Sequence, residues 1–266
     1  MRILGIDARG NTMQIFLRIS LFLTLMGGWE ILAATGIANP FYSSQPSHIL
    51  KDLPLFYNSG DLLKHTGVTL AEAMWGLLFG TVGGIAVAFL LGLFDFFGKV
   101  VEPFITALYG IPKLALAPIF VLWFGLGIES KIIMSGLLVF FLVFFSTYGG
   151  IKSVDRNILT SVRLMGATQA QIVFKVILPS SVPWILAGVR GGLGASLIGA
   201  IVGEYMGASA GLGWVISYAT SFFKVDRVMS CIFILFVVGI VFNMALKHVE
   251  KLLLKWRPPL DYSGTL

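Results

Sequence analysis

Six long apolar segments alternate with shorter polar ones along this sequence. They lie at about residues 13–34, 70–94, 104–126, 132–149, 184–204 and 228–247. A helix rises about 1.5 Å per residue and the hydrocarbon core of a bilayer is about 30 Å thick, so about 20 apolar residues cross it once. Only 12% of the 266 residues are charged, about half the fraction usual in soluble domains. The pattern predicts an all-α integral membrane protein with about six transmembrane helices.

The charged residues between the apolar segments predict the orientation of the chain. Twelve Lys and Arg side chains flank one set of segment ends, and five flank the other. Because cytoplasmic loops are rich in Lys and Arg, we expect both termini on the cytoplasmic side of a bacterial-type inner membrane. The net charge of +6 then reflects topology and not a nucleic-acid partner. The expected organisation is a cytoplasmic N-terminus at 1–12, a membrane domain at 13–256 with external segments at 40–65 and 207–227, and a cytoplasmic tail at 257–266.

Signatures of enzymes are largely missing from the sequence. The three histidines, His48, His65 and His248, are scattered, and one cysteine is present, so no metal-ligand group is visible. The segment from Gly92 to Lys99 resembles a phosphate-binding loop, but its glycines are one residue too far apart and no strand precedes it. We therefore expect no catalytic residue, metal or cofactor in this chain.

Small residues recur every fourth position in two of the apolar segments. Such a stripe lines one face of a helix and lets a second helix approach closely. The prolines at 40, 46 and 54 are expected to break any long helix in the first external segment. The stripes place helix contacts at Gly76, Gly80 and Gly84 in the second segment and at Gly191 and Gly199 in the fifth.

Three charged residues lie within or beside apolar segments. Lys113 follows Pro112 in the third segment, which Pro112 and Pro118 break, and we consider it either a pathway residue or part of an interhelical bond. Arg190 is either a gate residue or a side chain that reaches the headgroups or bonds to the preceding loop. Glu204 ends the fifth segment near the external side, as a gate, a contact for a partner, or an acid held by water.

The longest internal polar stretch, residues 152–183, contains a helical pattern interrupted by Gly166 and ended by Pro179. The apolar spacing predicts two short helices joined at the glycine, with Pro179 stopping further helix. This arrangement is either a plain connection between two spans or a surface for a cytosolic partner.

The same stretch resembles a known loop. Gly166, nine further residues, Val176, Leu178 and Pro179 match the EAA loop of ABC-importer permeases, while Thr160-Ser161-Val162 stand where Glu-Ala-Ala is usual. The chain is similar, in the same order, to the nitrate/sulfonate/taurine branch of that family at Gln45-Pro46-Ser47, Gly110-Ile111-Pro112, Trp123-Phe124-Gly125-Leu126-Gly127, Ser130-Lys131-Ile132, Gly188-Val189-Arg190, Val202-Gly203-Glu204 and Gly211-Leu212-Gly213.

The resemblance implies a type I ABC-importer permease fold and a set of partners. These are a second permease chain, expected to be identical, two cytosolic subunits that bind ATP and Mg, and an external solute-binding protein. It implies that the loop couples the ATPases to the membrane helices through Thr160, Ser161, Val162, Arg163, Gly166, Ala167, Leu178 and Pro179. The solute would be a small anion such as a sulfonate, taurine or nitrate, with a thiamine-pyrimidine precursor as the alternative.

Two other classes of function remain as alternatives at this stage. A self-sufficient channel or secondary carrier would usually show a second half of matching hydropathy or more membrane carboxylates. An intramembrane enzyme would need a catalytic group that the sequence does not display.

Overall fold

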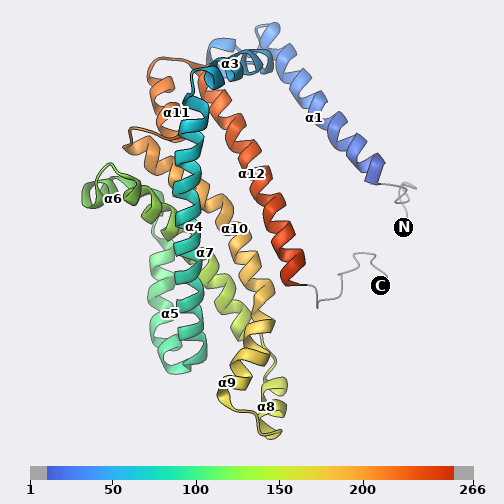
Figure 1. Ribbon diagram of the computed structural model, residues 1–266, viewed down its shortest axis with the longest axis vertical. Helices are drawn as coiled ribbons and strands as arrows, with labels where there is room; N and C mark the ends of the chain where they lie inside the picture. Colours follow the sequence, from blue (N-terminus) through green and yellow to red (C-terminus); the bar gives the residue numbers. More distant parts are fainter. Residues whose placement is uncertain (1–10, 255–266) are drawn as a thin grey trace. The chain divides into compact units, whose positions relative to one another are not determined.

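A computed structural model of the chain describes residues 11–254 (Figure 1). Within that range the chain is helical and contains no strand. Five helices are long and apolar enough to cross a membrane, and a sixth span is present if one bent pair of helices is counted. The prediction of an all-α membrane protein with about six spans is confirmed. The cytoplasmic tail expected at 257–266, and most of that expected at 1–12, lie outside the described residues.

The described residues form two compact units, one made of residues 11–62 and 216–233 and the other of residues 63–215 and 234–254. The helices, in chain order, are α1 (Asn11–Ala34), α2 (Pro40–Ser43), α3 (Pro46–Asn58), α4 (Asp61–Leu93), α5 (Asp95–Gly110), η1 (Lys113–Leu116), α6 (Ala117–Phe124), α7 (Ile128–Lys152), α8 (Arg156–Leu164), α9 (Gln169–Ile172), the π-helical turn η2 (Val173–Ile177), α10 (Leu178–Met206), α11 (Leu212–Ser221) and α12 (Val225–Leu253).

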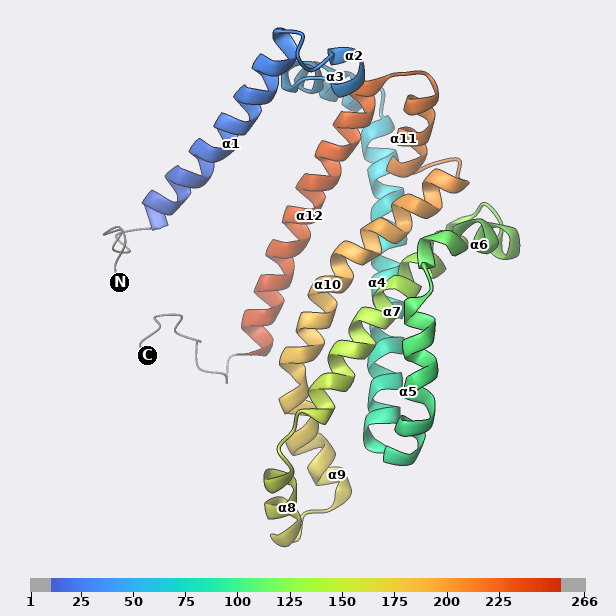
Figure 2. The same cartoon turned by 180° about the vertical axis from the view of Figure 1, so that it is seen from behind.

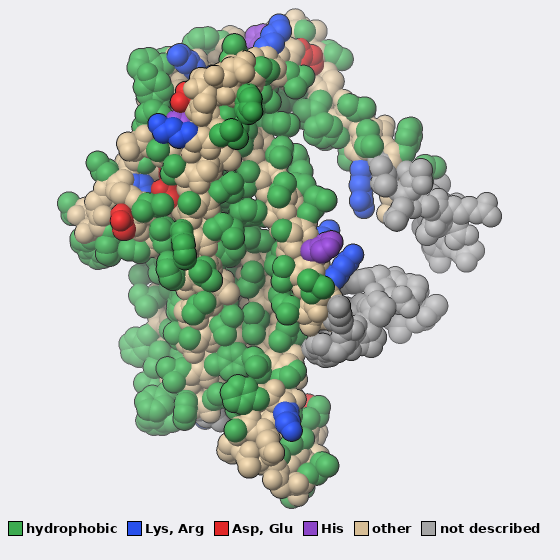
Figure 3. Space-filling view, in the orientation of Figure 1, with side chains coloured by type: hydrophobic (Ala, Val, Ile, Leu, Met, Phe, Trp, Pro, Cys, Tyr) green, Lys and Arg blue, Asp and Glu red, His purple; other side chains and the backbone are tan. Residues whose placement is uncertain are grey.

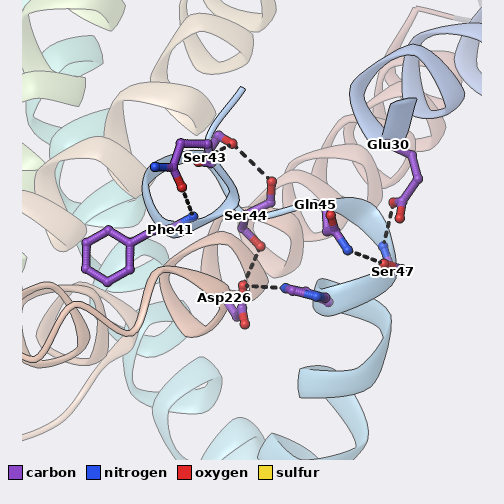
Figure 4. Close-up of polar contacts among 9 residues, drawn as sticks. Glu30, Phe41, Ser43, Ser44, Gln45, Ser47 and Asp226 are labelled. Atoms are coloured by element: carbon purple, nitrogen blue, oxygen red, sulfur yellow. Dashed lines mark hydrogen bonds and ion pairs between the residues drawn. The ribbon is translucent and has the colours of Figure 1, made fainter. Parts of the chain in front are cut away.

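Polar contacts hold the first unit together. The Arg227 guanidinium donates to both carboxylate oxygens of Asp52, at 2.8 and 3.0 Å. Ser44 donates to Asp226 at 2.7 Å, and the Ser47 backbone N–H donates to Glu30 at 3.0 Å (Figure 4). Here α3 starts at Pro46 and continues through a second proline at position 54. A proline in the first turn of a helix costs little because its missing N–H has no intrahelical partner there.

Two helices begin earlier than hydropathy indicates. The second span was expected to begin at residue 70, but α4 begins at Asp61. The fifth was expected to begin at residue 184, but helical structure is continuous from Gln169 to Met206. The prediction that Pro179 stops the helix is wrong, because Pro179 lies in the first turn of α10, directly after the wide π-helical turn. A π turn changes the hydrogen-bond register there, so the missing donor is tolerated.

The third span, expected at 104–126 and broken at Pro112 and Pro118, is a pair of helices broken at the first of these prolines. α5 begins at Asp95, and the chain then bends by 79° between α5 and the η1–α6 segment. The break falls at Ile111, which is extended, with φ −69° and ψ 134°, as the residue before a proline prefers. Pro118 does not break the segment, because it lies in the first turn of α6.

Helices α4, α7 and α10 pack closely through small residues. A Cβ atom added at Gly76 would lie 2.2 Å from the Ser135 hydroxyl oxygen, and one at Gly80 would lie 2.5 Å from the Gly136 carbonyl oxygen. At Gly199 it would lie 2.5 Å from Ser135 Cα. Gly84 lies equally close to α7, with the Phe140 carbonyl oxygen 2.9 Å from the same atom.

Gly191 does not belong to this close contact. Its added Cβ would meet a single atom at 3.8 Å, an ordinary contact distance, whereas Gly188, one turn earlier, would meet Ser146 Cβ at 2.9 Å. Gly191 thus lies at ordinary contact distance from Leu142 of α7, farther than the other stripe positions, because a repeat of four drifts relative to a helix of 3.6 residues per turn. The outward faces of α4 and α5 carry mostly apolar side chains, as Figure 3 shows, which suits helices in lipid.

Candidate functional site

The segment between α7 and α10 projects as a small helical hairpin made of α8 and α9 (Figure 1, Figure 2). Its turn has the geometry of a Schellman motif: the Gly166 N–H donates to Arg163 O at 2.9 Å, and the Ala167 N–H donates to Val162 O at 3.2 Å. Gly166 has φ +85°, a left-handed conformation that favours glycine. The glycine of the sequence motif is thus required by the backbone.

The start of α9 is fixed by a second local device. Thr168 accepts from the Gln171 N–H, and the Gln171 side chain accepts from the Thr168 N–H at 2.8 Å, which completes a capping box. Such a box satisfies donors that a helix start leaves without partners. Because both the turn and the following helix start are specified locally, the sequence dictates the shape of the hairpin.

The hairpin has an inner and an outer face. Val162 and Ala167 pack with Leu159 against a core cluster that contains Ile172 and Ile177. At the tip, Leu164 and Met165 are 84% and 85% exposed, and Ile158 on α8 is also exposed. Two adjacent large apolar side chains held in solvent on a rigid turn are suited to a partner surface.

The predicted coupling residues are divided between these two faces. Thr160, Ser161 and Arg163 are exposed on α8, and Thr160 donates to the Arg156 carbonyl oxygen at 2.9 Å. Leu178 and Pro179 are partly buried and belong to the start of α10. Leu164 was not among the residues predicted for this surface. The amphipathic spacing of α8 indicated that the helix has two faces, but it does not show which face packs and which is exposed.

A pocket of about 430 Å³ lies at the break between α5 and η1. Its walls are formed by Tyr109, Gly110, Ile111, Pro112, Lys113, Leu138, Leu142 and Ala195. The Lys113 ammonium contacts the Tyr109 carbonyl oxygen, which the break leaves accessible, and lies 4.1 Å from the centre of the Tyr109 ring and 4.7 Å from that of Phe141. Aromatic faces and free carbonyls stabilise a cation there.

The other two predicted pathway residues do not join this pocket. Arg190 on α10 forms an ion pair with Glu250 on α12, which is an interhelical bond between an exposed and a partly exposed side chain. Glu204 was expected at the external mouth as a gate, a partner contact or a water-held acid, but it is 1% exposed and accepts hydrogen bonds from Thr69 and from the Gly213 N–H, each at 2.6 Å. The three charges therefore lie in three different surroundings.

Four buried polar residues near Glu204 were missed by sequence analysis. His65, Thr69 and Glu72 lie on α4 and Lys131 lies on α7, and each is at most 3% exposed. Their spacing of three and four residues on α4 was a signal that they share a face. Nothing in the sequence indicated that this face meets the end of α10.

Residues 80–255 match the family of binding-protein-dependent transport system inner membrane components. The chain is 38% identical over 237 residues to the formylaminopyrimidine transport permease protein ThiX of Halalkalibacterium halodurans, covering 89% of this chain and 94% of that protein. It is 33% identical to the putative aliphatic sulfonates transport permease protein SsuC of Bacillus subtilis, over 86% of this chain and 83% of that protein.

A third relative and a solved structure agree with these matches. The taurine transport system permease protein TauC of Escherichia coli is 29% identical over 91% of this chain and 90% of its own length. An inward-facing structure of the MetNI methionine ABC transporter superposes with a TM-score of 0.66 at 19% identity, covering 75% of this chain and 98% of that chain. This last likeness concerns the fold alone.

Proposed function

This chain belongs to the family of binding-protein-dependent transport system inner membrane components, and from this premise we propose that it is the permease subunit of an ATP-driven importer. Its partners would be a second permease chain, expected to be identical, two cytosolic ATPase subunits that hold ATP and Mg, and an external solute-binding protein. The chain itself would carry out no covalent chemistry.

The observation that carries the proposal is the tip of the α8–α9 hairpin. Leu164 and Met165 are held almost fully exposed by a turn whose glycine conformation and capping box are set by the sequence. An exposed apolar pair costs free energy in water, about 1.5–3 kcal/mol for each large side chain that a partner would bury. A cytosolic ATPase that covers this tip would gain that energy and transmit its motion into α10, with which α9 is continuous.

The pocket beside Lys113 is the candidate solute pathway. It combines apolar walls with one ammonium group at a helix break, and an intramembrane charge of this kind usually marks a pathway. A small anion such as a sulfonate, taurine or nitrate suits that charge. A formylaminopyrimidine-like solute is the second candidate, favoured by the 38% identity to a permease of that solute.

The orientation that goes with this function places the α8–α9 hairpin and both termini in the cytoplasm. The excess of Lys and Arg on that set of segment ends supports it. The α11 end of the second unit would then face outside, where a binding protein delivers solute.

The coupling role can be tested in vesicles that contain the complete transporter, by measuring ATP hydrolysis stimulated by the liganded binding protein. Met165→Asp places a charge on the exposed tip without disturbing the packed face, so we expect loss of stimulation and of ATPase recovery on the permease with normal membrane insertion. Gly166→Arg should act likewise through its left-handed φ, while Gly166→Asn, which tolerates that conformation, serves as the matched control. Unchanged stimulation and uptake in both Met165→Asp and Gly166→Arg would make the hairpin a plain connector and favour a channel or carrier.

A further inference from the structure

The first turn of α11 is held by side chains from other helices. Three consecutive backbone N–H groups donate to them: Gly211 to His65 Nδ1 at 3.0 Å, Leu212 to Thr69 Oγ1 at 2.8 Å, and Gly213 to Glu204 Oε2 at 2.6 Å. The N–H groups at a helix start have no partner within the helix, and they favour a negative charge nearby. Here α4 and α10 supply the cap that local sequence usually provides.

Both carboxylate oxygens of Glu204 act as acceptors in this cap. Thr69 Oγ1 accepts from the Leu212 N–H, and its hydroxyl group donates to Glu204 Oε1 at 2.6 Å, nearer than the His65 carbonyl oxygen at 3.2 Å. The glycines allow this approach. A Cβ atom at Gly211 would lie 2.1 Å from Glu204 Cδ, and one at Gly213 would lie 2.4 Å from the Ile201 carbonyl oxygen. The Gly-Leu-Gly sequence therefore fits around the carboxylate.

A second carboxyl group and an ammonium complete the cluster. Glu72 is 2% exposed and lies beside Glu204, and its Oε2 has no hydrogen-bond partner of its own. Lys131 interacts with both carboxyl groups, and its Nζ donates to the carbonyl oxygens of Leu126, at 2.8 Å, and of Gly207, at the end of α10.

We propose that Glu204 is a positioning residue that fixes the first turn of α11 onto the outer ends of α4 and α10. In this role Glu204 is not a gate, because its hydrogen bonds hold α4, α10 and the first turn of α11 together. Lys131 extends the same joint to α7 and to the connection between α6 and α7.

The proposal gives this joint a place in the transport cycle and rests on the proposed function in that respect. The first turn of α11 lies at the end of α10 opposite the α8–α9 hairpin (Figure 2), which is the end an external binding protein would meet. Holding that turn in one position would keep the surface that the binding protein contacts in a fixed conformation. Loss of the joint should weaken stimulation by the binding protein and leave basal ATP hydrolysis in place.

Hydrogen exchange of the backbone amides at 211–213, measured by mass spectrometry on the complete transporter in vesicles, tests the joint directly. Glu204→Gln replaces one acceptor oxygen by an NH₂ group that faces a donor. We expect exchange at these amides to become about 10- to 100-fold faster, the range for losing a hydrogen bond to a charged group, and stimulation by the binding protein to fall.

Thr69→Val should act like Glu204→Gln, because it removes the acceptor of the Leu212 N–H and a donor to Glu204. Thr69→Ser keeps the hydroxyl group and is the matched control, which should show native exchange and native stimulated hydrolysis.

Two results would overturn the proposal. One is native exchange and stimulation in Glu204→Gln when the protein is normally inserted. The other is native exchange at 211–213 in Thr69→Val, which would mean that these side-chain contacts do not hold the turn. If the native transporter shows no stimulated hydrolysis, the proposed function fails, but the exchange pattern still decides whether Glu204 holds α11.

Discussion

Replacement of Gly80 by alanine should separate two effects that glycine has in a membrane helix. A Cβ atom at this position would lie 2.5 Å from the Gly136 carbonyl oxygen and 2.7 Å from Val139 Cβ, so α4 and α7 must move apart locally by about 1 Å to reach ordinary contact. Overpacking of this kind costs about 1–3 kcal/mol. Alanine also gains about 1 kcal/mol over glycine in helix propensity. This gain offsets part of the packing cost in the measured stability.

Gly83→Ala is the control that has the gain in helix propensity without the packing cost. Gly83 lies on the same helix, three residues later, and its added Cβ would meet Phe140 Cδ2 at 3.5 Å, an ordinary contact. Both variants gain the same propensity, so the difference between them is the packing cost alone. At about 2–4 °C per kcal/mol for a chain of this size, Gly80→Ala should unfold roughly 2–12 °C below Gly83→Ala.

The assay heats each purified variant in detergent and measures the fraction that still elutes as folded protein in size-exclusion chromatography. Equal midpoints for Gly80→Ala and Gly83→Ala would refute the reasoning, because they would mean that α4 and α7 do not touch at Gly80. A lower midpoint for Gly83→Ala would refute it as well.

Two further predictions concern the pathway and the topology. Lys113→Met removes the cation that lies over Tyr109 and Phe141, so solute uptake should fall at least severalfold while stimulated ATP hydrolysis persists, and Lys113→Arg should retain most uptake; equal uptake in Lys113→Met and the native transporter would remove the pocket from the pathway. In a Cys231→Ala background, an impermeant maleimide should label Asn58→Cys in intact cells and should label Gln169→Cys only after the membrane is opened, and the reverse pattern would invert the proposed orientation. Both positions are exposed, so protection at either one reports the membrane and not burial.

The spans could be predicted from the sequence because hydropathy depends on composition over about 20 residues, which lipid exposure dictates directly. The predicted ends were misplaced for the same reason. The first turns of α4 contain Asp61, Lys64 and His65, which lower the local hydropathy although helical hydrogen bonding continues through them. At Pro179 the sequence rule for proline was sound, but the preceding π turn changed the hydrogen-bond register to which the rule applies.

The α8–α9 hairpin was predictable for a different physical reason. Its turn depends on Gly166 and its second helix on Thr168 and Gln171, all within six residues, so local chemistry specifies it. The exposure of Leu164 and Met165 depends on which side of α8 packs onto α9 and η2. That choice is made by the core cluster around Ile172 and Ile177, and no local pattern encodes it.

The surroundings of Glu204 could not be predicted from the order of residues along the chain. An acid at the end of an apolar span suggests a headgroup contact. The donors that Glu204 meets in the structure are Thr69, 135 residues earlier, and Gly213, nine residues later, so the order of residues does not bring them together. The informative signal was the pair Gly211 and Gly213, whose missing side chains leave the space that the carboxylate occupies. An acid that ends a span and is followed by two closely spaced glycines is therefore better interpreted as the cap of the next helix than as a gate, because a carboxylate that meets backbone N–H groups is stabilised where a free one in the membrane would not be.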